Sequence, residues 1–417
     1  MIEPKLRFKA DDGSQFPDWE EKTFNDVADY KKGPFGSALK KEIFVPKSND
    51  TVKVYEQQNA ISKDWKLERY FVTNEYFQLK MKPFAVSGGD IIVSCAGTIG
   101  EMYELPDDAE EGIINQALMR VRIKKPVINS IIFRCAFDKM ISTEGVKISN
   151  GSALKNIPPF ADMKKQSVFV PSLPEQQKIA DFLSTIDTVI EKQKATVEAW
   201  KERKKGVIQK LFSQEVRFKA DDGSEFPDWE EKKIEDVATC FAGATPSTKV
   251  PEYWMNGTIQ WMSSGEVNNG QIYETEKKIS QLGFDKCSTK MVKPNTVVMA
   301  LAGQGKTRGM VAITRTSLCT NQSLCAIETI DDICDDYLYQ YLQTQYDNLR
   351  LISSGDGIRG GLNLKLVGGY VIKIPCLAEQ QKIADCLSSL DDVIEKQKAT
   401  LAAWEEMKKG LLQQMFV

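Results

Sequence analysis

Two long segments of the chain repeat apolar residues at alternating steps of four and three. One runs from Ile179 to Leu211 and the other from Ile383 to Met415. This spacing puts one apolar stripe on an α-helix and is typical of a coiled-coil seam. At 1.5 Å per residue, each helix is expected to extend roughly 54 Å. Because neither helix can bury its stripe alone, the sequence predicts that the two pair, in an antiparallel arrangement.

The expected seam has two polar positions, Gln193 and Gln397, which either fix the register or lie at the edge of the seam. Gly206 and Gly410 each follow a Lys-Lys pair and weaken a helix by about 1 kcal/mol. We expect them to mark a break or a close contact. The apolar and aromatic seam positions are Ile179, Leu183, Ile186, Ile190, Val197, Trp200, Ile383, Leu387, Leu390, Ile394, Leu401 and Trp404.

The helices belong to a tandem duplication. The segment Arg7–Lys22, RFKADDGSQFPDWEEK, returns at Arg217–Lys232 with a single change, Gln15 to Glu225, and we call each copy the box. Glu175–Trp200 returns as Glu379–Trp404. The chain therefore consists of a box, a variable region and a helix, twice over. The two variable regions look little alike. Two constant frames that carry different inserts favour a protein that recognises two different targets with one arrangement of its domains.

The variable regions mix short strands with a few helices, so the sequence predicts an α+β fold with an internal pseudo-two-fold repeat. The expected limits are 1–174 for the first domain, 175–213 for its helix, 214–378 for the second domain and 379–417 for its helix. Helices are expected at Ile128–Met140 and Asp335–Leu349. Strands are expected at Asp90–Cys95, Ala117–Ile123, Gln166–Pro171, Thr296–Leu301, Met310–Thr314 and Gly369–Pro375.

Composition narrows the functional classes. The 417 residues suit two or three domains, and no run approaches the 18 apolar residues of a membrane span. The first residues lack the apolar stretch of a signal peptide, and nine cysteines form no C-x-x-C pair, so we expect reduced thiols and a cytoplasmic location. Histidine is absent, which excludes Ser-His-Asp and Cys-His catalysis, His-metal nucleases and most zinc sites.

Positive charge is concentrated in the variable regions, although the whole chain has a net charge of −3. Residues 31–82 contain eleven Lys and Arg against six Asp and Glu, and residues 241–318 contain nine against five. The first box has three against five. Basic inserts on an acidic frame indicate that the inserts face phosphate, while a solvated surface of mixed charge is the alternative.

Three fragments imitate catalytic motifs. Ala302–Thr307 resembles the end of a Walker A loop, but Ala300 stands where the pattern needs glycine. Asn156–Phe160 resembles an amino-methyltransferase motif, but Ile157 separates the asparagine from the prolines. Pro17–Lys22 has the letters of a nuclease core, whose acids must lie on separate strands. We expect Trp19 and Trp229 to anchor the start of each domain instead.

The arrangement resembles the specificity subunit of type I restriction-modification systems. The second half has the opening Gly243-Ala244-Thr245-Pro246-Ser247, followed by Tyr253-Trp254 and Ile259-Gln260-Trp261. The closing pattern P-x-L-x-E-Q-Q-K-I-A-x-x-L occurs at Pro171–Leu183 and, with Ala378 in place of one proline, at Pro375–Leu387. The duplicated layout covers essentially the whole chain. The first half departs from the pattern, with Lys32–Ser37 as its opening and no Tyr-Trp pair.

This resemblance implies that each variable region is a target recognition domain for one half of a split site in double-stranded DNA. The helices then form a spacer and a docking platform for two modification subunits. Those subunits would carry methyl transfer with S-adenosylmethionine, and separate restriction subunits would carry cleavage driven by ATP and Mg. The chain itself is expected to be non-catalytic, with no cofactor and no metal.

Candidate DNA contacts are polar or basic residues on loops, which can reach base edges and phosphates. Asn115-Gln116 and Asn321-Gln322 precede strands, and either contact with adenine or a structural turn fits them. In the first domain the candidates are Lys31, Lys32, Ser37, Lys40, Lys41, Thr98 and Lys155. In the second they are Thr245, Ser247, Lys249, Ser263, Ser264, Gln304, Lys306, Thr307, Arg308 and Arg359.

Two other classes are compatible with the residues. The chain could be a stand-alone DNA-binding or anti-restriction protein that uses the same frame, which co-purification with a methyltransferase would distinguish. It could also be a coiled-coil scaffold, which a gel shift on random duplex DNA would test.

Overall fold

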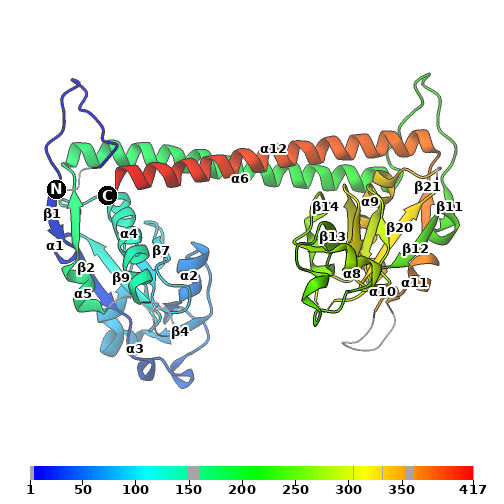
Figure 1. Ribbon diagram of the computed structural model, residues 1–417. Coiled ribbons are helices and arrows are strands. Elements are labelled where there is room, and N and C mark those ends of the chain that lie inside the picture. The colour runs from blue at the N-terminus through cyan, green and yellow to red at the C-terminus, as the bar shows by residue number, and fades with distance from the viewer. Residues whose placement is uncertain (1–3, 149–158, 304, 331, 354–360, 417) are drawn as a thin grey trace. The chain divides into compact units, whose positions relative to one another are not determined.

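The computed structural model describes residues 4–148, 159–303, 305–330, 332–353 and 361–416. The chain forms two compact units, Met1–Gln193 with Leu401–Val417, and Lys194–Thr400 (Figure 1). The two units therefore divide within the long helices. Within the described residues, no helix is both long and apolar enough to cross a membrane.

The first unit is built on two four-stranded sheets. One has the order β2-β9-β6-β7 and the other β4-β3-β8-β5, and only the β3–β8 pair is parallel. The strands of the first sheet are β2 (Ala28–Lys32), β6 (Ile91–Ser94), β7 (Met102–Glu104) and β9 (Leu118–Ile123). Those of the second are β3 (Thr51–Tyr55), β4 (Tyr70–Thr73), β5 (Ala85–Val86) and β8 (Gly112–Ile114).

A third, two-stranded sheet joins the first box to the end of the variable region, where β1 (Glu20–Thr23) pairs with β10 (Ser167–Val170). The helices around the sheets are α1 (Phe24–Val27), α2 (Gln57–Ser62), α3 (Asn74–Tyr76), α4 (Ser130–Ile148) and α5 (Phe160–Lys165). Four further helical turns are η1 (Gly36–Ala38), η2 (Lys41–Ile43), η3 (Phe77–Met81) and η4 (Lys82–Phe84).

The second unit repeats this plan with one added strand. Its sheets have the orders β12-β20-β17-β18-β14 and β15-β13-β19-β16, and a small sheet pairs β11 (Glu230–Lys233) with β21 (Val371–Ile374). The other strands are β12 (Ala238–Ala242), β13 (Ile259–Met262), β14 (Gln271–Ile272), β15 (Lys277–Ile279), β16 (Met291–Val292), β17 (Val297–Ala300), β18 (Val311–Thr314), β19 (Leu318–Thr320) and β20 (Leu324–Thr329). The helices and turns are α7 (Ile234–Val237), η5 (Pro251–Tyr253), η6 (Ser264–Asn269), α8 (Gln281–Asp285), α9 (Asp335–Thr344), α10 (Tyr346–Ile352) and α11 (Leu364–Gly368).

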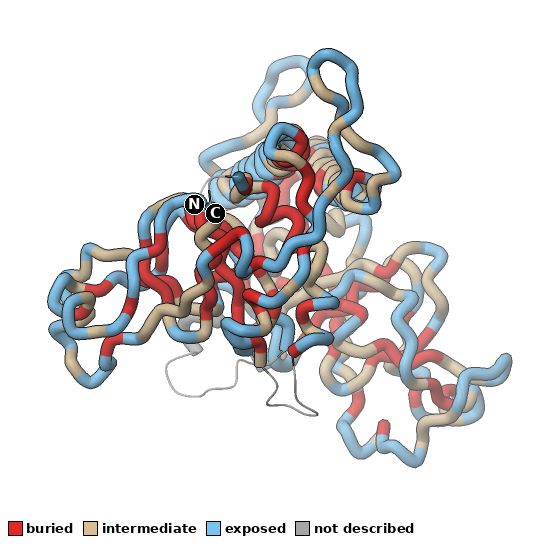
Figure 2. The backbone as a smooth tube through the Cα atoms, turned by 90° about the vertical axis from the view of Figure 1, so that its right-hand side faces the viewer, coloured by how far each residue is buried: buried red, intermediate tan, exposed pale blue. Residues whose placement is uncertain are grey.

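The two variable regions thus share one topology despite their different sequences. The order β2-β9-β6-β7 corresponds to β12-β20-β17-β18, and β4-β3-β8-β5 corresponds to β15-β13-β19-β16. Even the single parallel pair of the smaller sheet recurs, as β3–β8 and as β13–β19. In Figure 2 the buried backbone follows the strands of each unit. Comparable burial of unlike side chains accounts for one topology with little sequence similarity.

All six expected strands are confirmed. Each begins at least one residue later than expected, and all but β9 and β18 also end one residue earlier. The expected helix Ile128–Met140 begins at Ser130, because the side chain of Asn129 accepts a hydrogen bond from the amide of Ile131, and it continues to Ile148. The expectation of one helix over Asp335–Leu349 is wrong. Gln345 has φ −91° and ψ 6°, and it separates α9 from α10.

The long helices are α6 (Leu173–Phe212) and α12 (Leu377–Met415). In the first unit, Ile179 and Leu183 of α6 share a core with Met415 of α12. In the second, Leu211 of α6 shares a core with Ile383 and Leu387 of α12. The start of each helix therefore packs on the end of the other, and in each unit the pair is antiparallel, as expected.

Of the twelve apolar and aromatic seam positions, eight are buried. The remaining four, Trp200, Leu390, Leu401 and Trp404, are half-buried. The expectation for Gly206 and Gly410 is wrong. Both lie inside continuous helices, and a Cβ at either position would meet nothing within 4 Å.

An ion pair crosses the seam in each unit. Lys204 Nζ lies 2.7 Å from both carboxylate oxygens of Asp391, and Lys408 pairs with Asp187, the equivalent residue of the other copy. Asp391 also accepts a hydrogen bond from Gln340 Nε2 of α9 at 2.9 Å. These pairs select the antiparallel register, because a shift of either helix would leave half-buried charges without partners.

Each box is fixed to the start of its own long helix through a fully buried glutamate. Glu175 accepts hydrogen bonds from Arg7 Nε at 3.1 Å, from Arg7 Nη2 at 2.9 Å and from Trp19 Nε1 at 3.1 Å. Arg217, Trp229 and Glu379 repeat this arrangement in the second unit at 3.1, 2.7 and 3.1 Å. The tryptophans anchor the start of each domain, as expected.

The next residue of each helix, a glutamine, holds the variable region by its backbone. Gln176 Oε1 accepts from the amide of Asn129 at 2.7 Å, and its Nε2 donates to the carbonyl oxygens of Val127 and Pro171. Gln380 binds the amide of Cys334 and the carbonyl oxygens of Asp332 and Pro375 in the same way. Because these partners are backbone groups, the contacts do not depend on which side chains the variable region carries.

We predict that Glu175→Ala destabilises the first unit by roughly 3–5 kcal/mol, since it removes one member of a buried ion pair. Urea denaturation followed by tryptophan fluorescence would measure the loss. Gln15→Glu is the matched control, because Glu225 occupies that position in the second copy, and its effect should be within about 0.5 kcal/mol. An unchanged urea midpoint for Glu175→Ala would contradict the prediction.

Candidate nucleic-acid interface

Four loops of each variable region meet at one edge of the two sheets. In the first unit they are residues 33–38, 56–57, 95–101 and 115–117, which follow β2, β3, β6 and β8. The amide of Gly33 donates to Leu118, that of Cys95 to Ala117, and that of Asn115 to Tyr55. The corresponding loops of the second unit are residues 243–249, 263–265, 301–309 and 321–323. We call each set the four-loop edge.

The same meeting of loops occurs in the second unit. The amide of Leu301 donates to the carbonyl of Ser323 at 2.8 Å, and that of Asn321 to Met262 at 3.1 Å. A Cβ on Gly243 would lie 1.8 Å from the carbonyl oxygen of Thr320, and one on Gly33 would lie 1.8 Å from that of Asn115. Glycine is therefore required where β2 and β12 end, which explains why both openings keep it.

The opening loop of the second unit is held by two tryptophans. Trp261 Nε1 donates to the carbonyl oxygen of Ala244 at 3.0 Å, and Trp254 Nε1 donates to that of Ser247 at 3.3 Å. The two rings meet edge to face with centroids 5.1 Å apart. The Tyr-Trp and Ile-Gln-Trp signatures thus position the loop, while Thr245, Ser247 and Lys249 on it are exposed.

The loop between β17 and β18 carries the densest set of candidate residues. Arg350 Nη1 of α10 donates to the carbonyl oxygen of Gly305 at 2.7 Å, and Tyr346 Oη donates to that of Lys306 at 2.6 Å. Lys306 is exposed, and Thr307 and Arg308 are half-buried. Because this loop joins two antiparallel strands and no helix follows it, it does not have the strand-to-helix form of a Walker A loop.

The equivalent loop of the first unit is shorter and contains Thr98. Its backbone is held by Gln57, whose Nε2 donates to Ala96 O at 2.5 Å, and by Ser94, whose hydroxyl donates to Thr98 O at 2.6 Å. Thr98 itself is exposed. Lys32, at the end of β2, is exposed, and so are Ser37 on the opening loop and Lys40 and Lys41 close after it. Lys31 instead lies over the ring of Phe84, 4.9 Å from its centroid.

Several polar candidates have structural partners within the edge. Ser263 donates both its amide and its hydroxyl to Glu266 Oε2, so it caps η6, and Ser264 is half-buried beside it. The Oδ1 atoms of Asn115 and Asn321 accept from amides two residues ahead, which supports the turn interpretation for both. Gln322 accepts from Thr245 Oγ1 at 2.6 Å. Lys155, Gln304, Arg359 and residues 156–158 of the Asn156–Phe160 fragment lie outside the described residues.

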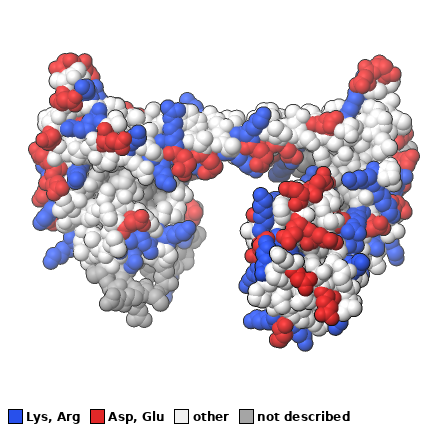
Figure 3. Space-filling view, turned by 180° about the vertical axis from the view of Figure 1, so that it is seen from behind, with Lys and Arg blue, Asp and Glu red and all other residues white. Residues whose placement is uncertain are grey.

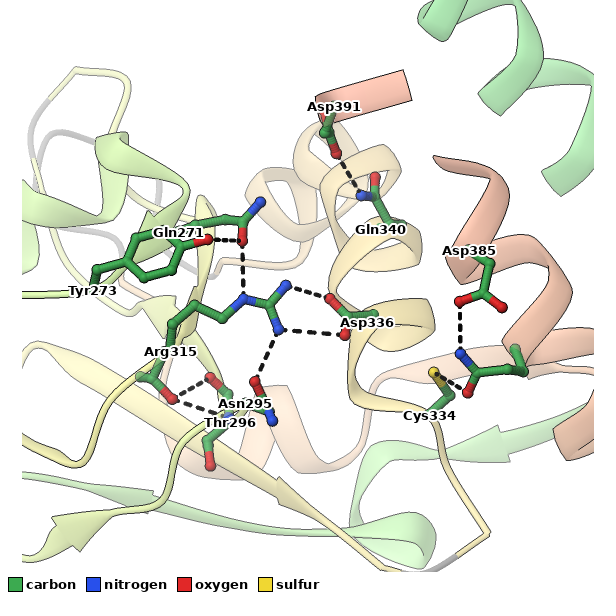
Figure 4. Close-up of polar contacts among 12 residues, drawn as sticks. Gln271, Tyr273, Asn295, Thr296, Arg315, Cys334, Asp336, Gln340, Asp385 and Asp391 are labelled. Atoms are coloured by element: carbon green, nitrogen blue, oxygen red, sulfur yellow. Dashed lines mark hydrogen bonds and ion pairs between the residues drawn. The ribbon is translucent and has the colours of Figure 1, made fainter. Parts of the chain in front are cut away.

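Two residues counted in the basic excess are engaged inside their domains. Lys53 is fully buried, donates to the carbonyl oxygen of Trp65 and lies over the ring of Tyr55, and burial lowers its pKa. Arg315 follows β18, at the strand end remote from the four-loop edge. It donates to Gln271, Asn295 and Asp336 (Figure 4). Burial is the largest single influence and lowers the pKa of Arg315, but the hydrogen bond to Asp336 and the negative charge of Asp336 together raise it above the ordinary value.

Charge differs between the boxes and the variable regions. Figure 3 shows Lys and Arg interspersed with Asp and Glu on the surfaces of both variable regions, and mostly Asp and Glu at the projecting tips of the two boxes. In the parts of the chain that the structure describes, no three His, Cys, Asp or Glu residues are grouped to hold a metal ion. The four-loop edges therefore offer hydroxyl groups, amides and cations on rigid loops, which is a set suited to binding nucleic acid.

Comparison with known proteins decides the family. The sequence profile of the type I restriction modification DNA specificity domain matches residues 17–199 and 227–403. The chain belongs to this family. Each matched segment runs from a box to the middle of a long helix and contains one variable region, so the duplication seen in the residues is a duplication of this domain.

Curated relatives and solved structures agree with the assignment. The chain is 33% identical over 214 residues to the MjaIX specificity subunit of Methanocaldococcus jannaschii and spans about half of that protein, 48%. It is 22% identical to the MjaVIII specificity subunit of the same organism, covering 97% of this chain and 94% of that one. The S subunit structure from M. genitalium matches with a TM-score of 0.55 at 16% identity, covering 100% and 99% of the two chains. That structure supports the fold, and both relatives are named as specificity subunits of type I restriction enzymes.

We predict that Arg350→Met loosens the 301–309 loop and leaves the rest of the second unit folded. Loss of the hydrogen bonds from the guanidinium to the loop carbonyls should cost about 1 kcal/mol locally. Hydrogen exchange read by mass spectrometry should show faster exchange confined to this loop. Asn348→Ala, on the exposed side of the same helix, is the control. Equal exchange rates in the loop of both variants would contradict the role of Arg350 in holding the 301–309 loop.

Proposed function

We propose that the chain is the DNA-reading subunit of a type I restriction-modification complex and that each variable region reads one half of a split target. The observation that carries the proposal is the pair of four-loop edges. They have the same topology and the same close-packed glycine at the end of β2 and of β12, but different side chains, so one docking geometry presents two different recognition surfaces.

The chemistry of the two edges suits both parts of DNA recognition. Lys306 with Arg308, and Lys32 with Lys40, would contact phosphates and position the loops. Thr245 with Gln322 joins a hydroxyl to an amide at the exposed tip of the second edge, and such a pair can donate to and accept from base edges in the major groove.

We propose further that two copies of one modification subunit dock on the constant frame. The exposed part of the frame supports this, because identical side chains recur in both copies. Asp11 and Asp12 recur as Asp221 and Asp222, and the exposed Gln177 recurs as Gln381. Asp12 also accepts hydrogen bonds from Ser14, and Asp11 pairs with Lys178, so both serve the box as well. Equal exposed surfaces on both copies nevertheless suit two equal partners. S-adenosylmethionine, ATP and Mg would then bind to partner subunits.

We predict that Lys306→Ala combined with Arg308→Ala weakens DNA binding and lowers its dependence on salt. Each lost phosphate contact should reduce the slope of log K against log[salt] by roughly 0.9. Fluorescence anisotropy on a labelled duplex between about 50 and 200 mM salt would measure this.

The charge-matched control is Lys278→Ala with Lys293→Ala, since both lysines are exposed and neither belongs to a four-loop edge. A wild-type slope for the Lys306 and Arg308 variant would place the 301–309 loop away from the phosphates. Equal losses in both variants would indicate a general charge effect.

We also predict that replacing residues 241–373 by the equivalent region of a relative changes one half-site and preserves the other. Gln380 forms its hydrogen bonds to this region with backbone atoms. A foreign insert with the same topology should therefore form the same bonds. Methylation sequencing of cells that carry the exchanged gene would read both half-sites. Alteration of both half-sites would contradict the assignment of one domain to each. Co-purification of a methyltransferase in the same strain would separate this role from that of a stand-alone DNA-binding protein.

A further inference from the structure

The first four-loop edge carries an aromatic ring in open solvent. Phe35 is 91% exposed, the highest value among the large hydrophobic side chains that the structure describes. Single exposed apolar residues are common on protein surfaces and need no explanation by themselves. The position of Phe35 is what distinguishes it, because it stands on the loop that follows β2, among Lys32, Lys40 and Lys41.

The backbone of the loop is held in place on both sides of Phe35. Gly33 donates its amide to Leu118 and has no room for a Cβ, and Pro34 is buried. The carbonyl oxygen of Phe35 accepts the amide of Ala38 at 2.9 Å, which closes the turn at η1. Tyr76 Oη then donates to the carbonyl oxygen of Ala38 at 2.8 Å. Both sides of Phe35 are therefore anchored, and the ring projects from a rigid support.

The second unit has a different residue at the same position. Gly33 corresponds to Gly243, the glycine packed on the following strand, so Phe35 corresponds to Thr245 two residues later. Thr245 is exposed and donates to Gln322 at 2.6 Å. The same loop position thus carries a hydroxyl group hydrogen-bonded to a side-chain amide in the second domain and an apolar ring in the first.

We propose that Phe35 is a specificity-determining residue of the first domain, and that its ring makes an apolar contact with the bases of the half-site that this domain reads. The inference rests on the proposed DNA-reading function. Phosphate contacts of the neighbouring lysines would bring the ring of Phe35 against the base pairs. Burial of the ring there removes apolar surface from water, which favours binding. The ring packs there on a thymine methyl group or enters a base step.

The test compares Phe35→Ala and Phe35→Trp in the complex with its modification subunits, on a duplex that contains the methylation site found by sequencing. Phe35→Ala should weaken specific binding roughly tenfold to hundredfold and keep the wild-type salt slope, because no phosphate contact is lost. Phe35→Trp should keep binding within about threefold, since a larger ring retains the apolar contact. Unchanged thermal unfolding of both variants would show that the fold is intact.

Tyr273→Ala is the matched control, since Tyr273 is an aromatic residue that is 67% exposed and lies outside the four-loop edges. It should bind like the wild type. Replacement of each thymine of the first half-site by deoxyuridine, and of each adenine by 2-aminopurine, would locate the contact. A loss with deoxyuridine that is absent in Phe35→Ala marks a methyl contact, and fluorescence that depends on Phe35 marks entry into a base step.

Wild-type affinity for Phe35→Ala on the specific duplex would overturn the proposal while leaving the proposed function standing. So would an equal loss in Tyr273→Ala. If the wild-type complex itself fails to prefer the specific duplex to random duplex, the proposed function fails, and this result is distinct from either outcome for Phe35.

Discussion

A carboxylate that is shielded from solvent at the first turn of each long helix governs the construction of this chain. Glu175 and Glu379 have no access to water, so each requires a cation and a further donor from another segment. The box supplies them as one arginine and one tryptophan. The requirement explains why the box and the helix recur together, since neither satisfies the buried charge alone. The glutamine that follows ties in the variable region through backbone groups, and the three parts are joined within a few residues.

The antiparallel helix pair depends on polar as well as apolar contacts. The apolar stripe alone is compatible with several registers, because heptads repeat. Lys204 with Asp391, and Lys408 with Asp187, select one of them, since each pair joins one copy to the other. The duplicated sequence thus encodes a symmetric contact in which each copy supplies the cation once and the anion once.

The sequence predicted the helices well because their heptads are long and each position repeats the same signal. It predicted short strands but not their order, which depends on contacts such as β13 with β19 between segments far apart in the chain. Counting charges placed Lys53 and Arg315 among the residues facing phosphate, although one is buried against rings and the other is held by Asp336. The loop residues were found by their chemistry, whereas Phe35 was missed because polar and basic types were sought. Its exposure depends on the fold, in which Gly33 and Pro34 pack against the domain and leave the next residue in solvent.

The packing of Trp19 on Phe416 has a consequence for synthesis of the chain. Their ring centroids lie 6.1 Å apart, so the core around the first box includes the last helical turn. In the other unit, Trp229 packs on Phe212, which comes from the end of the first helix. One unit is therefore continuous in sequence, from Lys194 to Thr400, and the other joins both ends of the chain. On the ribosome, the unit that contains residues up to Gln193 must wait for the segment from Leu401 onward, whereas Lys194–Thr400 needs no later segment to complete its core.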